Sequence, residues 1–175
     1  MQFLIDAFEA IRDFLELGGP VLRVIGVNIL FLWILILERL IYFRTGLRTM
    51  IQDSLDEWEG RAERRSWHAH QVRDAIISRV KISADKGLPM IQTLVALCPL
   101  LGLMGTVTGM ISVFEVMAIS GTSNARAMAA GVSRATVPTM AGMVGALSGV
   151  FLVTILTRTS KRSTGLLEDE LTMDH

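Results

Sequence analysis

Cysteine is nearly absent from this sequence. Among its 175 residues there is a single cysteine, Cys98, so no disulfide can form within the chain. Cys98 lies inside an apolar stretch, where packing as a small hydrophobic residue is the simplest interpretation. The sequence therefore excludes a disulfide framework as the basis of the fold.

An excess of charge of one sign is also absent. The 17 basic residues balance the 17 acidic ones, so nothing in the composition indicates a nucleic-acid partner. Common enzyme motifs are missing as well: there is no G-x-S-x-G, no H-E-x-x-H and no phosphate-binding loop. His68 and His70 form an H-x-H pair, but a pair without a third ligand is a weak metal signal. We expect a protein that is no enzyme and holds neither a metal nor a cofactor.

Ionisable residues are missing from two long stretches, residues 87–114 and 135–157. A third apolar stretch, residues 24–37, has Asn28 as its only polar side chain. About 20 apolar residues in a helix are needed to cross a hydrocarbon core of about 30 Å. The sequence therefore predicts an all-α integral membrane protein with three transmembrane helices.

These spans divide the chain into seven segments. Residues 1–20 carry apolar residues with a helical period and end at Gly18-Gly19-Pro20, which predicts an amphipathic helix. Such a helix lies either along the membrane surface or in a periplasmic collar. The remaining segments are the first span (21–43), a loop with helical extensions (44–87), the second span (88–117), a short turn (118–126), the third span (127–157) and a tail (158–175).

Basic residues predict the orientation. The loop 44–87 and the start of the tail, residues 158–162, are rich in Lys and Arg. The segments 1–20 and 118–126 hold one Arg each. Since basic residues near span ends favour the cytoplasmic side, we expect the N-terminus outside, the loop inside and the C-terminus inside. The turn at 118–126 is then periplasmic, and the tail is cytoplasmic.

Small residues recur at matching positions in the second and third spans. Each span carries the pattern G-x-x-G-x-x-x-G: Gly102, Gly105 and Gly109 in the second, and Gly142, Gly145 and Gly149 in the third. This spacing predicts close helix packing in lipid, and we expect the subunits of an oligomer to meet through these faces. Thr106 and Thr139 interrupt the two stripes of small residues. Their hydroxyls could bond across helices, bond to their own helix or line a pore.

Two charged residues lie towards the outer ends of these spans, Glu115 in the second and Arg134 in the third. Charges inside a membrane need a partner or an aqueous cavity, so we expect an ion pair between them. Pro138 cannot donate a hydrogen bond to the Arg134 carbonyl, which predicts a kink there.

Two segments resemble the ExbB/TolQ/MotA proton-channel family. Residues 102–111, GLMGTVTGMI, followed by Phe114, are similar to its second-span signature, and residues 131–143, GVSRATVPTMAGM, to its third. The pair Glu38-Arg39 after the first span is similar too. The short loop and the three-span layout look closest to ExbB.

The resemblance implies a homopentamer in the bacterial inner membrane, with an ExbD-like single-span partner in its pore. With a TonB-like protein, such a complex couples proton-motive force to outer-membrane import. Thr106 and Thr139 match the family's pore-facing hydroxyl positions, whereas Arg134 stands where ExbB and TolQ carry Glu. The titrating acid would then belong to the partner. Two alternatives are a TolQ-like subunit for envelope maintenance and a passive oligomeric membrane scaffold.

Overall fold

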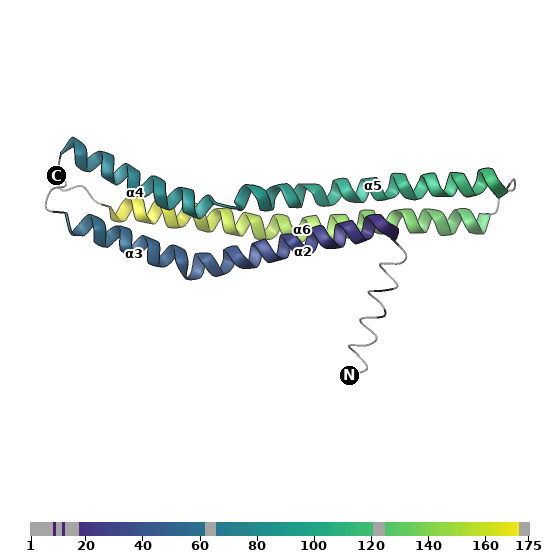
Figure 1. Cartoon of the computed structure of the whole chain (residues 1–175), viewed down its shortest axis with the longest axis horizontal. Helices are drawn as coiled ribbons and strands as arrows, with labels where there is room; N and C mark the ends of the chain where they lie inside the picture. The colour runs from purple at the N-terminus through teal and green to yellow at the C-terminus, as the bar shows by residue number, and fades with distance from the viewer. Residues whose placement is uncertain (1–8, 10–11, 13–17, 62–65, 121–124, 172–175) are drawn as a thin grey trace. The chain divides into compact units, whose positions relative to one another are not determined.

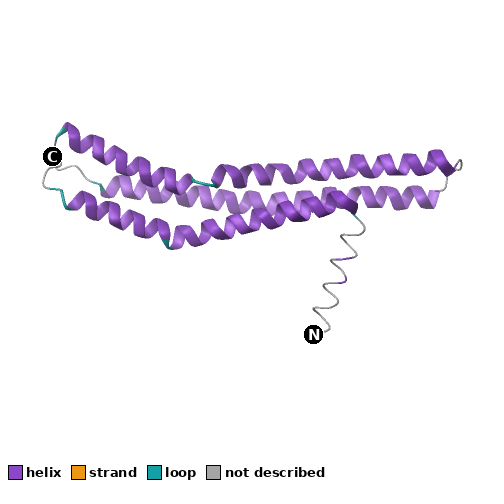
Figure 2. Cartoon of the chain, viewed as in Figure 1, coloured by secondary structure: helices purple, strands orange, loops and turns teal. Residues whose placement is uncertain are grey.

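Every described element of the chain is a helix (Figure 2). The computed structural model describes residues 9, 12, 18–61, 66–120 and 125–171. In chain order, Figure 1 labels the helices α2 (Gly19–Arg44), α3 (Gly46–Glu59), α4 (Trp67–Asp85), α5 (Leu88–Ser120) and α6 (Ala125–Glu170). The predicted all-α fold class is confirmed. The amphipathic helix predicted over residues 1–20 lies almost wholly outside the described residues.

Three helical stretches are long and apolar enough to cross a membrane. Within the described residues they are Gly19–Glu59, Trp67–Ile119 and Met128–Glu170. Their apolar parts contain α2, α5 and the first two thirds of α6, which correspond to the predicted spans. The prediction of a three-span protein is therefore confirmed, whereas its orientation stays a prediction.

The helices are shared between two compact units. The first unit comprises Met1–Trp33 and Thr93–Val150, and the second comprises Ile34–Gln92 and Phe151–His175. In the first unit, Ile25 and Leu32 of α2, Cys98 of α5 and Ala135 of α6 are all buried. One polar residue joins this apolar core: the amide nitrogen of Asn28 donates to the Leu94 carbonyl (3.0 Å) and to Cys98 Sγ (3.1 Å). A buried amide needs such acceptors, because water is absent from a helix interface in lipid.

The second unit has a core of its own. It is formed by α3, α4 and the adjoining parts of α2 and α6, and its largest fully buried side chains include Trp58, Leu47, Ile76, Leu167 and Leu171. Ser66 caps α4 by accepting from the Ala69 amide at 3.3 Å. Tyr42 and Ser83 share a hydrogen bond of 2.6 Å that ties α2 to α4. The second unit therefore combines an apolar core with a polar contact between α2 and α4.

Helix α6 extends beyond the predicted third span. The basic residues Arg158 to Arg162 indicate a span end near residue 157, yet the helix continues to Glu170. Its final turn is stabilised by Arg73, which donates to the Leu171 carbonyl (2.8 Å) and to the Glu168 carbonyl (2.7 Å). A cation at a helix C-terminus satisfies carbonyls that have no partner in the helix. Most of the predicted tail is therefore helical.

A tight joint connects α4 to α5. Gly87 adopts a left-handed backbone with φ of +82°, which a glycine tolerates without strain. A Cβ atom added there would lie 2.9 Å from Nε of Arg39, so the glycine also leaves room for this arginine. Arg39 is 8% exposed, and its guanidinium lies 5.2 Å from the Tyr42 ring centre. The Arg39 side chain therefore packs against the short joint between α4 and α5.

Candidate functional site

The six glycines of the predicted stripes lie at close helix contacts in the first unit. A Cβ added at Gly102 would lie 3.0 Å from Cα of Thr139, and one at Gly109 would lie 2.6 Å from Cβ of Ala135. Added to Gly105 or Gly142, it would collide with Pro138 or with the Cys98 carbonyl oxygen. The backbones of α5 and α6 thus approach more closely than larger side chains would permit.

The glycines also make room for α2. A Cβ at Gly145 would lie 2.6 Å from Cδ1 of Ile29, and one at Gly149 would lie 3.0 Å from Cδ2 of Leu32. These glycine faces are occupied by helices of the same chain. Whether subunits of an oligomer also meet through these faces stays a prediction.

Thr139 bonds across the pair of helices. Its hydroxyl donates to the Gly102 carbonyl of α5 at 2.9 Å, and its side chain remains half-buried. A hydroxyl carries two lone pairs besides its proton, so Thr139 Oγ1 can still accept a hydrogen bond. The same side chain can therefore hold the helices together and present an acceptor to a neighbouring water or partner.

Thr106 uses its hydroxyl differently. It donates to the Leu103 carbonyl of its own helix at 2.7 Å, and the residue is also half-buried. Because Thr139 bonds to residue 102, Thr106 lies about one helical turn away along α5. The two hydroxyls belong to the same pair of helices but are not level. Whether both face a pore stays a prediction.

Arg134 and Glu115 are both exposed. In the described part of a single chain, no ion pair joins them. The contact of Gly109 with Ala135 explains this, because it puts Arg134 roughly five residues, or about 8 Å, from the level of Glu115. The predicted ion pair between Glu115 and Arg134 stays a prediction.

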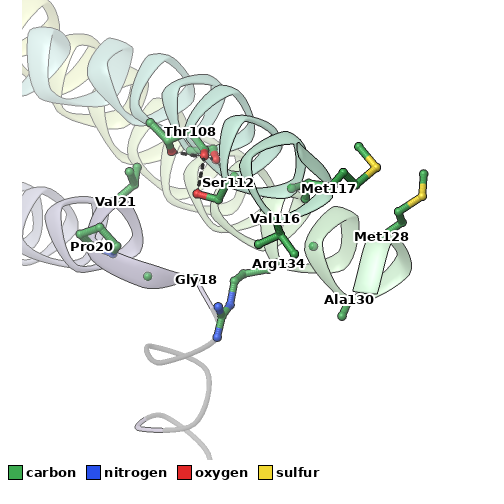
Figure 3. A pocket seen from close by; sticks show the side chains of 15 residues that line it. Gly18, Pro20, Val21, Thr108, Ser112, Val116, Met117, Met128, Ala130 and Arg134 are labelled. Carbon is green, nitrogen blue, oxygen red and sulfur yellow. Dashed lines mark hydrogen bonds between the residues drawn. The ribbon is translucent and has the colours of Figure 1, made fainter. Parts of the chain in front are cut away.

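A cavity of about 680 Å³ opens beside Arg134 in the first unit. Its lining includes Gly18 just before α2, Val21 of α2, Thr108 and Ser112 of α5, and Arg134 of α6 (Figure 3). The Ser112 hydroxyl donates to the Thr108 carbonyl at 3.1 Å, and the Thr108 hydroxyl donates to the Met104 carbonyl. Both hydroxyls therefore donate within α5 and not into the cavity. Arg134 projects from α6 towards the side of Gly18 (Figure 3). The sequence did not predict this cavity, because it depends on where α2 begins against α5 and α6.

Pro138 is fully buried against Gly105, and α6 continues through it as a helix. Pro99 likewise lies inside α5. Neither proline ends its helix, since tertiary contacts can compensate for the missing donor in a membrane. The predicted kink at Pro138 stays a prediction.

Asn28 makes contacts between helices that were not predicted from the sequence. Its bonds to Leu94 and Cys98 join α2 to α5 at the level where α6 contributes Gly142 and Gly145. The signal was present, because Asn28 is the only polar side chain of its stretch. A polar residue inside a span commonly bonds to a neighbouring helix.

The chain shows similarity to proteins of one family. The MotA/TolQ/ExbB proton channel family matches residues 42–169, a region that includes α5, nearly all of α6 and the glycine contacts between them. Two curated proteins of Synechocystis sp. are similar over shorter regions. One, named as biopolymer transport protein ExbB-like 1, is 38% identical over 74 residues, which is 41% of this chain and 29% of that protein.

The other relative, named as biopolymer transport protein ExbB-like 3, is 30% identical over 83 residues, or 46% of this chain and 40% of that protein. The chain thus matches less than half the length of each relative. The family match is much longer and covers most of the chain. Members of that family are proton channel subunits, so the expectation that this protein is no enzyme is confirmed. On the strength of this match, the chain belongs to the MotA/TolQ/ExbB proton channel family.

Proposed function

We propose that this chain is the channel subunit of a proton-driven motor in the bacterial inner membrane. In this proposal five copies form a ring around an ExbD-like single-span partner. With a TonB-like protein, the complex couples proton-motive force to outer-membrane import. The N-terminus lies in the periplasm, while α3, α4 and the end of α6 lie in the cytoplasm.

Family membership over residues 42–169 is the observation that carries the proposal. The chemistry of the spans supports it. Residues 88–114 and 135–157 contain no acid, so this chain offers no carboxylate at mid-membrane to carry a proton. A bare proton in hydrocarbon is heavily penalised, so a partner's carboxylate has to carry it.

The hydroxyls of Thr106 and Thr139 give that carboxylate polar neighbours. Both residues are half-buried in the single chain, which leaves part of each side chain open to a central pore. Towards the outer mouth, the exposed Arg134 of one subunit and Glu115 of the next form an ion pair. Arg134 serves in this pair as a fixed cation, since a guanidinium does not release its proton at physiological pH.

Proton flux into vesicles tests the proposal directly. The chain is reconstituted into liposomes with and without an ExbD-like partner, and a pH-sensitive dye inside records acidification under an imposed gradient. We expect flux above background only when the partner is present. Absence of flux with a correctly assembled partner complex would identify a passive scaffold instead.

Complementation separates an import role from an envelope role. A strain lacking its own channel subunits for TonB-dependent import regains growth on a TonB-dependent nutrient if the import proposal holds. Rescue of detergent resistance alone would indicate a TolQ-like role. The mass of the intact complex measures the proposed ratio of five subunits to the partner.

A further inference from the structure

Asp85 makes a short hydrogen bond between two helices of the second unit. Ser160 of α6 donates its hydroxyl proton to Asp85 Oδ1 at 2.6 Å. Ser160 is only 1% exposed, whereas Asp85, the last residue of α4, is half-buried. The carboxylate is therefore anchored on one oxygen by a buried group while its side chain still reaches the surface.

A second polar atom lies one turn earlier on α6. Thr157 Oγ1 is buried and has no hydrogen-bond partner among the described residues. Thr157 and Ser160 are three residues apart and therefore lie on neighbouring positions of one face of α6. A buried hydroxyl without a partner is a place where an ordered water is expected.

Other acids are scarce at this end of the spans. Residues 88–114 of α5 and residues 127–167 of α6 contain neither Asp nor Glu. Glu38 of α2 is exposed, and its Oε2 lies 3.7 Å from Nε of Arg39, so that carboxylate faces a fixed cation. Asp85 is thus the first acid beyond the inner end of α5, and it is bonded directly to α6.

From this geometry we propose that Asp85 receives protons at the inner end of the path and releases them to cytoplasmic water. The proposal rests on the proton-channel function proposed above. A proton that arrives along the path protonates the water held at Thr157, and that water passes a proton to Oδ2 of Asp85, because Oδ1 already accepts from Ser160. The Oδ2–H bond then breaks, the proton passes to solvent water, and the carboxylate is restored. Ser160 acts as a positioning residue.

A purely structural role for the same bond makes different predictions. If Asp85 only fastens α4 to α6, then any change that breaks the bond impairs the protein, whether or not the acid remains. Asp85→Asn removes the ionisable group but keeps an oxygen that Ser160 can donate to. Ser160→Ala removes the bond but keeps the acid. The two variants therefore separate proton transfer from fastening.

The experiment measures proton flux in liposomes that contain the chain and its ExbD-like partner. For Asp85→Asn we expect flux to fall at least about tenfold, in line with the loss of a proton-transfer group. Ser160→Ala should keep most of the flux. Asp74→Asn, which neutralises an exposed acid on the same helix, is the matched control and should match the wild type.

Infrared difference spectra supply a second readout. Protonated Asp85 should give a carboxyl C=O band under an inward proton gradient. This band should vanish in Asp85→Asn and shift in frequency in Ser160→Ala, since the oxygen loses its donor. Normal flux in Asp85→Asn, or equal losses in both variants, would overturn the assignment of Asp85. A wild-type complex without flux would instead contradict the proposed function.

Discussion

The Thr139 hydroxyl makes one hydrogen bond across helices and can accept another. Its proton is donated to the Gly102 carbonyl, and its lone pairs stay available on a half-buried side chain. Thr106 has only a bond to its own helix. Removing the two hydroxyls therefore has different structural consequences, although both residues are predicted to line the pore.

The double variant Thr106→Val with Thr139→Val tests the pore hydroxyls. Valine keeps the shape of threonine, so assembly should persist, with a loss of about 0.5–1 kcal/mol for the bond to Gly102. Proton-coupled import should fall to a small fraction of the wild-type rate, and Thr→Ser variants should retain more. Thr108→Val is the control, because Thr108 bonds to its own helix as Thr106 does but, two residues further on, lies on another face of α5. Import at the wild-type rate in the double variant would show that the hydroxyls serve packing alone.

Arg134 tests whether a fixed cation is needed at the outer mouth. Arg134→Lys preserves the charge and should retain substantial import activity, whereas Arg134→Ala would leave Glu115 of the next subunit unpaired. We expect the alanine variant to lower the melting temperature of the assembled complex. The double variant Glu115→Arg with Arg134→Glu exchanges the two charges, so its complex should be more stable than that of the alanine variant. If alanine and lysine variants behave alike, the side chain takes no part in an ion pair.

At the scale of helices, the glycine stripes determine how α2, α5 and α6 pack. The outcome could be predicted in part from the sequence, because small residues at intervals of three and four share one face of a helix. Which neighbour fills that face could not be predicted. The glycines of α5 face Thr139, Pro138 and Ala135 of α6, and Gly145 faces Ile29 of α2. This fit sets how far α5 and α6 are shifted along each other. The offset between Thr106 and Thr139 along the helix axes could therefore not be predicted from the sequence either.

Larger side chains at these glycines should disrupt the subunit itself. Gly105→Leu and Gly145→Leu force a side chain against Pro138 and Ile29, and overfilled contacts cost about 1–3 kcal/mol. The melting temperature of each variant in detergent should fall, and less oligomer should be recovered. Gly26→Leu is the matched control within a span, because a Cβ at Gly26 meets nothing within 4 Å. Equal losses at Gly26 would point to a general effect of leucine.

The extension of α6 beyond its apolar part was also not predicted from the sequence. Charged residues after 157 indicate the end of a span, but they do not end a helix. The helix continues because Leu167 is buried in the second unit and Arg73 caps the final carbonyls. The contacts of Arg73 join residues nearly a hundred positions apart, so the pattern of neighbouring residues in the sequence cannot predict them.

Arg73→Ala should therefore loosen the last turn of α6. Two bonds from a charged donor would be lost, at a cost of about 1–3 kcal/mol. Hydrogen exchange of amides near Glu168 should speed up, while amides in the apolar part of α6 should be unaffected. Arg79→Ala serves as the control on the same helix, because its contact with Glu57 is long (3.7 Å) and exposed. No change in exchange would show that burial of Leu167 suffices.

Considered as a whole molecule, the chain separates apolar surface from charge. Large apolar side chains of the first unit are exposed in the single chain, among them Phe31 (56%), Val144 (69%) and Leu147 (74%). Lipid, a second copy or a partner span must cover such a surface. Most basic residues belong to the second unit instead, which accords with the proposed cytoplasmic side. The distribution of charged residues along the sequence shows this separation, and for that reason the three spans were predicted correctly.

The buried contact of Asn28 with Cys98 has a practical consequence for chemical labelling. Cys98 is the chain's single cysteine, it is 0% exposed, and its sulfur accepts a hydrogen bond inside the helix packing. A maleimide probe should therefore leave the native protein unlabelled in intact membranes and react only after denaturation. The wild-type chain is in effect already a cysteine-free background. Single cysteines introduced at exposed positions could report sidedness and motion without any prior substitution in the core.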